Sequence, residues 1–253
     1  MSKPNKFKRL FFDIEVSPNV VYSWNIGETR LSHDNIIKER AIICICYKFE
    51  GDSKIHSLTW NKGDDKKLLE DFSKIINSAD EVIGHNGDNF DIKWIKARAI
   101  YHRISIIPDI QSIDTLKIAR KGFRFNSNKL DYLGQYLGLG KKIDNGGFSL
   151  WKEVLNNSKP ALDKMVKYCK QDVNLLEKVF QALNKYTLPK AHIALYNGGS
   201  ILDCPNCSSK RTISNGLRIT ATGLSKRRLQ CLDCGKYFSI PETTYKSLTK
   251  ITK

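Results

Sequence analysis

Acidic side chains occur in this sequence at spacings that would let them share one site. In "LFFDIEVSP" (residues 10–18), Asp13 and Glu15 lie two residues apart in a strand-like apolar segment, so both would project from one face of a strand. Neighbouring carboxylates repel one another unless a cation lies between them, and Mg²⁺ binds carboxylate oxygens while keeping several waters. The alternative for this pair is a strand end at which both acids face solvent.

Two later segments add acids with the same potential. "GHNGDNFD" places Asp91 in the first turn of a helix that follows a short strand, where its alternative role is to cap that helix. "YCKQD" places Tyr168 and Asp172 four residues apart, hence on one face of a long helix, where the alternative is an exposed polar pair. The three segments in this order favour one shared metal site over three unrelated roles.

The order of the motifs, DIE, then N-x₃-FD, then Y-x₃-D, resembles the three exonuclease motifs of the DEDDy branch of 3′–5′ exonucleases. That family has a ribonuclease H-like fold and includes the proofreading domains of family B DNA polymerases and stand-alone bacterial and phage proteins. The resemblance spans about residues 8–186. No polymerase domain is evident, so the resemblance is to a free-standing nuclease, similar to those of phages.

The resemblance implies a role for each motif residue. Two Mg²⁺ or Mn²⁺ ions about 4 Å apart would flank the scissile phosphate. Tyr168 would orient the attacking water, because a phenol with a pKa near 10 is too weak a base to do more unaided. Asn86 and Phe90 would contact the terminal nucleotide by hydrogen bonding and stacking, although Phe90 could equally be helix-packing core. The expected metal ligands are Asp13, Glu15, Asp91 and Asp172.

Several other residues near these motifs carry weaker expectations. Trp24, in "VYSWNIG", could stack on a base. Structural roles are expected for His85 and Asp114, and Cys44 and Cys46 are most simply core thiols on one face of an apolar strand.

The C-terminal segment carries a second metal-binding pattern. Two Cys-x₂-Cys pairs, separated by a 23-residue spacer, would form a closed, structural Zn²⁺ site through Cys204, Cys207, Cys231 and Cys234. The β-prone, turn-rich spacer predicts the hairpin of a zinc ribbon, whose small core would depend on the metal for stability. Docking to a protein is the alternative to phosphate binding by its basic residues, which are Arg211, Arg218, Lys226, Arg227, Arg228 and Lys236.

Periodicity along the chain predicts an α/β fold. Strands are expected at residues 8–14, 41–49 and 54–60, followed by helices alternating with short strands. The longest helical pattern begins near Pro160 and continues to Tyr186. This order of elements indicates a central mixed sheet. The resemblance implies that residues 1–190 form a ribonuclease H-like, mixed five-stranded sheet flanked by helices, and a linker with the small Cys₄ zinc ribbon is expected in residues 191–253.

Charge indicates the kind of partner. The 253 residues include 42 Lys/Arg and 26 Asp/Glu, a net charge of +16, and residues 201–253 alone contribute +7. Nucleic acid is the first candidate partner for so basic a chain, with simple solubility as the alternative. Neither a membrane-spanning run nor a signal-peptide pattern is evident, so a reducing cytoplasm is expected, that of the host if a phage encodes the chain.

The predicted function is a metal-dependent 3′–5′ exonuclease that favours DNA, with single strands or 3′ ends as substrate and the ribbon helping to hold nucleic acid. RNA remains possible, as does a protein partner of the ribbon, and the oligomeric state is open. The alternatives are an exoribonuclease or structure-specific endonuclease on the same site, and a non-catalytic nucleic-acid-binding protein. Four retained acids argue against the last, because a binding module gains nothing from negative charge near phosphates.

Overall fold

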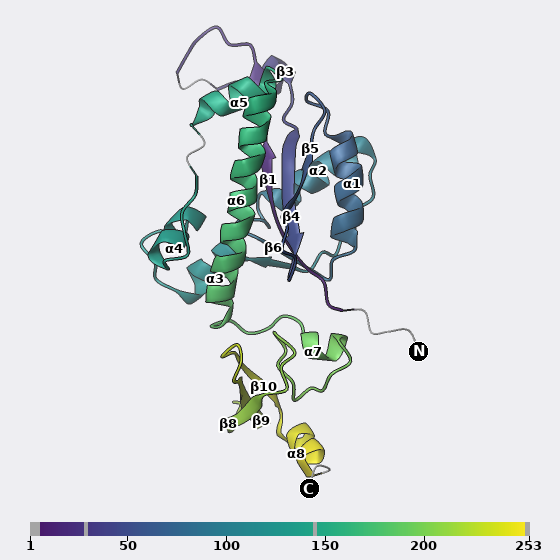
Figure 1. Ribbon diagram of the computed structural model, residues 1–253, viewed down its shortest axis with the longest axis vertical. Coiled ribbons are helices and arrows are strands. Elements are labelled where there is room, and N and C mark those ends of the chain that lie inside the picture. The colour runs from purple at the N-terminus through teal and green to yellow at the C-terminus, as the bar shows by residue number, and fades with distance from the viewer. Residues whose placement is uncertain (1–5, 28–29, 144–145, 251–253) are drawn as a thin grey trace. The chain divides into compact units, whose positions relative to one another are not determined.

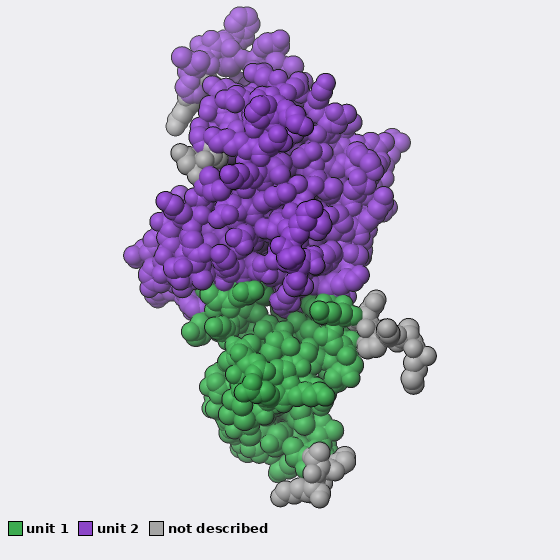
Figure 2. Space-filling model, in the orientation of Figure 1, with its two compact units in different colours: residues 1–7, 180–253 green, residues 8–179 purple. Residues whose placement is uncertain are grey.

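The computed structural model describes residues 6–27, 30–143 and 146–250 (Figure 1). The chain forms two compact units: one comprises residues 8–179, and the other comprises residues 180–253 with the N-terminal residues through Phe7 (Figure 2). Within the described residues, no helix combines the length and the apolar character needed to cross a membrane.

The first unit is built on a mixed five-stranded sheet in the order β5-β4-β1-β6-β7. β1 pairs antiparallel with β4, which pairs antiparallel with β5, whereas β1, β6 and β7 run parallel to one another. The strands are β1 (Arg9–Val16), β4 (Ile42–Phe49), β5 (His56–Thr59), β6 (Glu81–Gly84) and β7 (Ser112–Asp114). This sheet confirms the predicted architecture, including the three N-terminal strands.

Six α-helices belong to the same part of the chain, of which the last continues into the second unit. They are α1 (Lys66–Asn77), α2 (Asp91–His102), α3 (Thr115–Gly122), α4 (Leu130–Tyr136), α5 (Phe148–Leu155) and α6 (Lys159–Asn184). A small antiparallel pair, β2 (Val20–Val21) with β3 (Ile36–Lys38), and a 3₁₀ turn at His33–Asn35 lie between β1 and β4. The sequence patterns predict α6 but miss α5, β2 and β3, because these elements are too short for clear periodicity.

The two faces of β1 have different chemistry. Leu10, Phe12 and Ile14 point into a core that includes residues of α1 and α2. Asp13 and Glu15 alternate with them and therefore share the opposite face, toward α6. The neighbouring strand confirms this side, because Cys46 pairs with Asp13 and its thiol donates to the backbone oxygen of Val166 on α6 at 3.7 Å. One strand thus joins a dry core on one side to a polar site on the other.

A buried ion-paired cluster fixes α1 and α2 against β4. Asp65 is completely buried and accepts hydrogen bonds from the backbone of Ile42 and from two nitrogens of Arg98. The N-cap residue of α1 is Asp65, but the side chain that bonds the helix start is that of Asp64, whose Oδ1 accepts from the Lys66 backbone N–H at 2.9 Å. Asp64 therefore bonds the first turn of α1, whereas Asp65 accepts the buried hydrogen bonds from β4 and α2.

The second unit contains a three-stranded sheet in the order β10-β9-β8. Its elements are α7 (Ile193–Tyr196), β8 (Thr212–Ile219), β9 (Ser225–Cys231), β10 (Tyr237–Pro241) and α8 (Glu242–Lys250). β8 and β9 form an antiparallel hairpin in the spacer between the cysteine pairs, as predicted. A small cluster of buried apolar side chains, Leu229, Phe238 and Ile240, packs between this sheet and its neighbouring segments.

Candidate active site and metal centres

Three carboxylates from distant parts of the chain meet on the α6 side of the sheet. β1 contributes Asp13 and Glu15, and α6 contributes Asp172, with one oxygen from each within 4.8 Å of the others. Asp172 is 2% exposed, whereas Asp13 and Glu15 are only partly buried. The helix and strand thus place three oxygen ligands around one point.

Asp91 follows the loop after β6, and its side chain contacts the same strand, β1. It is the first residue of α2, it is buried, and its Oδ1 accepts a hydrogen bond from the backbone of Ile14 at 3.2 Å. Burial, followed by the nearby charges of Asp91, Glu15 and Asp172, raises the pKa of Asp13 well above its usual value. The fourth predicted acid is therefore close enough to affect the others electrostatically.

The site is electrostatically unfavourable as long as no divalent cation is present. Removal from water raises the pKa of Glu15 to about 8, with Asp172 adding to the shift, and raises the pKa of Asp91 to about 7. Burial also raises the pKa of Asp172, whose Oδ1 has no hydrogen-bond partner among the described residues. Four crowded carboxyls with an unpaired buried oxygen fit the oxygen-ligand preference of Mg²⁺ or Mn²⁺.

Lys142 is the site residue that the sequence does not reveal. Its Nζ lies 2.5 Å from Asp172 Oδ2 and 3.2 Å from the hydroxyl of Tyr168. Although its partial burial disfavours the charged form, Asp172 raises the pKa of the Lys142 ammonium, so it stays protonated. It precedes α5 in an irregular segment, where no periodicity relates it to the motif residues.

Tyr168 lies one helical turn before Asp172 on α6, as their spacing predicts. Burial and the Asp172 carboxylate raise the pKa of Tyr168 to about 12, so the phenol keeps its proton at neutral pH. A neutral phenol can donate or accept a hydrogen bond but is not a base. Its geometry is therefore consistent with orienting a water molecule.

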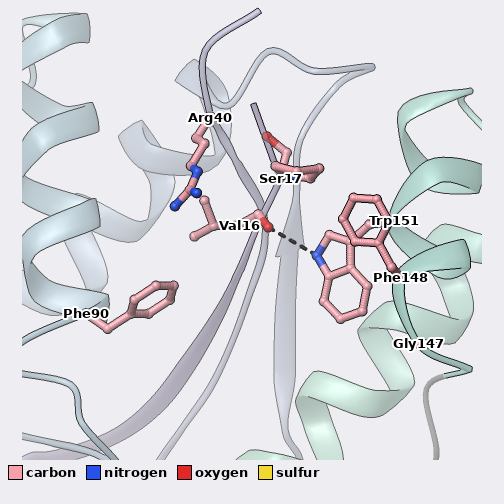
Figure 3. A pocket seen from close by; sticks show the side chains of 8 residues that line it. Val16, Ser17, Arg40, Phe90, Gly147, Phe148 and Trp151 are labelled. Carbon is pink, nitrogen blue, oxygen red and sulfur yellow. Dashed lines mark hydrogen bonds between the residues drawn. The ribbon is translucent and has the colours of Figure 1, made fainter. Parts of the chain in front are cut away.

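Phe90 lines a pocket of about 370 Å³ at the end of β1. Phe90 lies on one side of Val16, and Phe148 and Trp151 of α5 lie on the other (Figure 3). The Trp151 indole donates to the backbone oxygen of Val16 at 3.1 Å, which fixes α5 at the strand end. Arg40 adds a positive charge to this aromatic pocket.

Asn86 lines a different pocket of about 570 Å³, which also includes His85, Arg120, Lys129 and Lys142. The Asn86 backbone is left-handed, with φ of 66°, and its N–H donates to Asp114 Oδ1 at 2.9 Å. The two predicted nucleotide contacts of the second motif therefore face separate pockets.

His85 and Asp114 have the structural contacts expected of them. Asp114 Oδ1 also caps α3 through the Leu116 backbone, and His85 Nδ1 lies 2.9 Å from the Thr115 hydroxyl. Burial lowers the pKa of His85 to about 4, so this imidazole is neutral at physiological pH. Trp24, by contrast, is fully exposed at 101% and lines neither pocket.

The three remaining cysteines form a buried thiol cluster next to the acids. Cys44, Cys46 and Cys169 are each completely buried, in agreement with the prediction of core thiols for the first two. The Cys169 thiol donates to the backbone oxygen of Asp13 at 3.4 Å.

The four C-terminal cysteines converge as a set. Their Sγ atoms all lie within 4.8 Å of one another, with Cys204–Cys234 at 3.6 Å and Cys207–Cys231 at 3.7 Å. Tetrahedral zinc with Zn–S bonds of about 2.3 Å requires sulfur–sulfur distances of about 3.8 Å. The cluster thus fits a tetrahedral thiolate site for a metal ion.

The basic residues of the ribbon do not all face outward. Arg228 is exposed, but Arg227 donates two hydrogen bonds to Glu242 and lies over the Tyr245 ring. The expectation of a phosphate contact is wrong for Lys236, which is 1% exposed. Its Nζ donates instead to the backbone and side-chain oxygens of Asn184, at 2.7 and 2.8 Å.

The class of protein follows from this combination of sheet and acids. A family model described as RNase_H superfamily matches residues 10–184, so the chain belongs to that superfamily. Its membership makes it a nuclease-type hydrolase of nucleic acids. No curated protein matches the chain.

Proposed function

We propose that this chain is a metal-dependent 3′–5′ exonuclease of the DEDDy type, with DNA as the favoured substrate. The observation that carries the proposal is the convergence of Asp13, Glu15 and Asp172 within 4.8 Å, beside Asp91 and Tyr168. The order of the motifs adds the 3′–5′ direction by resemblance. The polymerase-like second motif favours DNA over RNA.

The four acids would hold two Mg²⁺ or Mn²⁺ ions at this position. Such ions lower the pKa of a bound water and stabilise the leaving 3′-oxygen during in-line hydrolysis of a phosphodiester. Lys142 forms an ion pair with Asp172 and so balances the charge of this acid. We infer that the same ammonium orients the Tyr168 hydroxyl, so that the phenol is held ready to position the attacking water.

The aromatic pocket supports the proposed contact of Phe90 with the terminal nucleotide. Phe90, Phe148 and Trp151 offer apolar surfaces for a base next to the strand that carries Glu15, and Arg40 supplies charge for a phosphate. Asn86 is proposed as a hydrogen-bonding contact from the neighbouring pocket. Trp24 stays a proposed stacking residue on an exposed loop.

In the second unit, one structural Zn²⁺ would be held by Cys204, Cys207, Cys231 and Cys234. The spacing of their sulfur atoms supports this assignment. Zinc would supply the stability that the small apolar cluster lacks. The resulting ribbon would assist nucleic-acid binding, with Arg228 as an exposed contact and Arg227 committed to Glu242.

The test compares the products from 5′-labelled DNA with and without Mg²⁺ or Mn²⁺. A 3′–5′ exonuclease shortens the labelled strand stepwise and releases mononucleotides only when the metal is present. Asp172→Asn should abolish the reaction, whereas Asp163→Asn, which removes an exposed acid from the same helix, should not.

Other results of this experiment would support one of the alternative functions. Internal cuts would indicate an endonuclease, and faster degradation of labelled RNA would indicate an exoribonuclease. Metal-dependent binding without any cleavage of either polymer would contradict an enzymatic function.

A further inference from the structure

A cluster of thiols lies beside the acids on the α6 side of the sheet. Asp13 of β1 pairs with Cys46 of β4, and Glu15 pairs with Cys44, so carboxylates and thiols occupy neighbouring strands on one face. Cys169 joins the two strand cysteines from α6, and one sulfur from each of the three lies within 4.8 Å of the others. We call these three cysteines the thiol cluster. The first unit thus places a set of sulfur ligands next to a set of oxygen ligands.

The spacing of these atoms fits a zinc ion. Tetrahedral zinc with Zn–S bonds of about 2.3 Å separates its sulfur ligands by about 3.8 Å, which lies within the observed limit. A carboxylate oxygen bonds zinc at about 2.0 Å, so the same tetrahedron puts that oxygen about 3.5 Å from each sulfur. The distance from Cys169 Sγ to Asp13 Oδ2 is 3.5 Å. Asp13 therefore lies where the fourth ligand of a Cys₃Asp site would be.

Sulfur ligands select a different ion from oxygen ligands. Thiolates favour Zn²⁺, whereas Mg²⁺ and Mn²⁺ favour carboxylates and water. Asp13 belongs to both sets, because its Oδ2 contacts Cys169 and its carboxylate also lies in the group formed with Glu15 and Asp172. An ion held by the sulfur set would therefore compete for an acid of the oxygen set.

We propose that Cys44, Cys46 and Cys169 form an inhibitory site for Zn²⁺, with Asp13 as the fourth ligand. Zinc at this site takes the Asp13 carboxylate away from the divalent ions of the acidic site, so hydrolysis slows. Binding releases the thiol protons to solvent, and no sulfur is oxidised. The inhibition rests on the proposed function, whereas the binding of zinc by the thiol cluster does not.

The ribbon should fill with zinc before the thiol cluster does. The ribbon offers four thiolates against three, and its Cys207 is exposed to solvent. The thiols of the cluster are completely buried, and a thiol in apolar surroundings loses its proton less readily. Asp13 is only partly buried, so an ion can enter from the acidic site. One equivalent of zinc should therefore occupy the ribbon, and only an excess should inhibit.

The experiment adds Co²⁺ to the full-length chain that already carries one zinc ion in its ribbon. Cobalt bonded to thiolates absorbs strongly in the near ultraviolet by charge transfer from sulfur, whereas cobalt bonded to carboxylates and water does not. Cobalt binds such ligands less tightly than zinc, so the ribbon keeps its zinc. The wild type should give this absorption band and lose it when excess Zn²⁺ is added.

Cys44→Ala removes one sulfur of the thiol cluster and leaves the ribbon zinc in place. It should weaken the binding of cobalt and of the second zinc at least about tenfold, because even an indirect partner of a metal ligand contributes about 10–100-fold. Ile45→Val removes a methylene from the opposite face of the same strand and is the matched control. This control should bind both ions as the wild type does.

Inhibition is measured with labelled DNA at a fixed concentration of Mg²⁺ and increasing free Zn²⁺. Zinc bound by the acids alone would inhibit the wild type and Cys44→Ala equally, so the ratio between the two proteins is the informative quantity. The zinc concentration that halves the rate should be about tenfold higher for Cys44→Ala than for the wild type or Ile45→Val. At free zinc that fills only the ribbon, all three proteins should cleave at the same rate, which shows that the variants are folded.

Either of two results would overturn the inference: a wild type without the charge-transfer band, or equal inhibition of the wild type and Cys44→Ala by zinc. The first result does not depend on whether any variant folds. A chain that shows the band but cleaves no DNA with Mg²⁺ would overturn only the exonuclease proposal. A chain that cleaves DNA but shows no band would overturn only the inhibitory zinc site.

Discussion

At the scale of single residues, the proposed site combines four acids that the sequence predicts with one cation that it does not. Asp13 and Glu15 were predictable because two acids in an apolar strand are costly without a cation between them. Lys142 was not, because its contact with Asp172 depends on how an irregular segment folds over α6. Residue types at fixed spacing indicate helices and strands, but they do not indicate where the side chains of an irregular segment lie.

Tyr168→Phe removes only the hydroxyl group that lies 3.2 Å from Lys142 Nζ. We expect the rate of hydrolysis to fall about 100-fold, because a water that is not oriented attacks less often. DNA affinity in Ca²⁺ should stay at the wild-type value. An unchanged single-turnover rate would remove Tyr168 from the mechanism.

The raised pKa values predict how stability depends on pH. In the metal-free protein, Glu15 with a pKa of about 8 keeps its proton in the folded state, whereas the unfolded chain loses it near pH 4.5. The free energy of unfolding should therefore fall as the pH rises from about 4.5 to 8. Mn²⁺ should oppose this loss at the upper end, because it binds the deprotonated acids.

Urea unfolding across this pH range, with and without Mn²⁺, measures the effect. Glu15→Gln removes the titrating group and should flatten the metal-free profile. A Glu15→Gln profile as steep as that of the wild type would assign the pH dependence to other groups.

At the scale of elements, α6 connects the chemistry to the packing. Its 26 residues carry Tyr168 and Asp172 on one face and buried apolar side chains that include Met165 and Val173. This helix was predictable from its length and periodicity, as was β1 from its alternation. α5 was not, yet it supplies Phe148 and Trp151 to the aromatic pocket.

The contact between α4 and α6 depends on a glycine. A Cβ at Gly134 would lie 2.7 Å from the Gly140 carbonyl oxygen and 2.7 Å from Leu175 Cδ1. Gly134→Ala should therefore destabilise the fold by about 1–3 kcal/mol through overpacking. It should also slow hydrolysis, because Gly140 lies two residues before Lys142.

Gly122→Ala is the matched control for this change. It lies at the end of α3, with nothing within 4 Å of its Cβ position, and should be neutral or slightly stabilising. Equal unfolding midpoints for the Gly134 and Gly122 variants would contradict the packing argument.

At the scale of the whole molecule, two compact units would use metal ions for different purposes. In the first, divalent ions would serve catalysis in a fold with a large apolar core. In the second, zinc would supply stability that a small apolar cluster cannot supply alone. The spacing of the cysteines made their cluster predictable. The burial of Lys236 was not predictable, because the sequence around a lysine in a basic segment does not indicate which oxygen atoms it will bond.

Cys231→Ser should lower the zinc content from one ion per chain to nearly none and unfold the second unit. Limited proteolysis would then cleave within residues 201–250, while the first unit stays intact. Cys44→Ala, a change in the sheet of the first unit, should keep the zinc. Full zinc content in the Cys231 variant would contradict the four-thiolate site.

The Lys236 ammonium also affects how the two units should be separated experimentally. It holds the carbonyl and the side-chain oxygen of Asn184, the last residue of α6, and lies 3.2 Å from the Thr187 hydroxyl. A shortened chain that stops before Lys236 would therefore leave the C-terminal end of α6 without these hydrogen bonds. Lower activity in such a fragment would report a damaged helix as readily as a lost DNA contact, so single substitutions are the sounder way to dissect this protein.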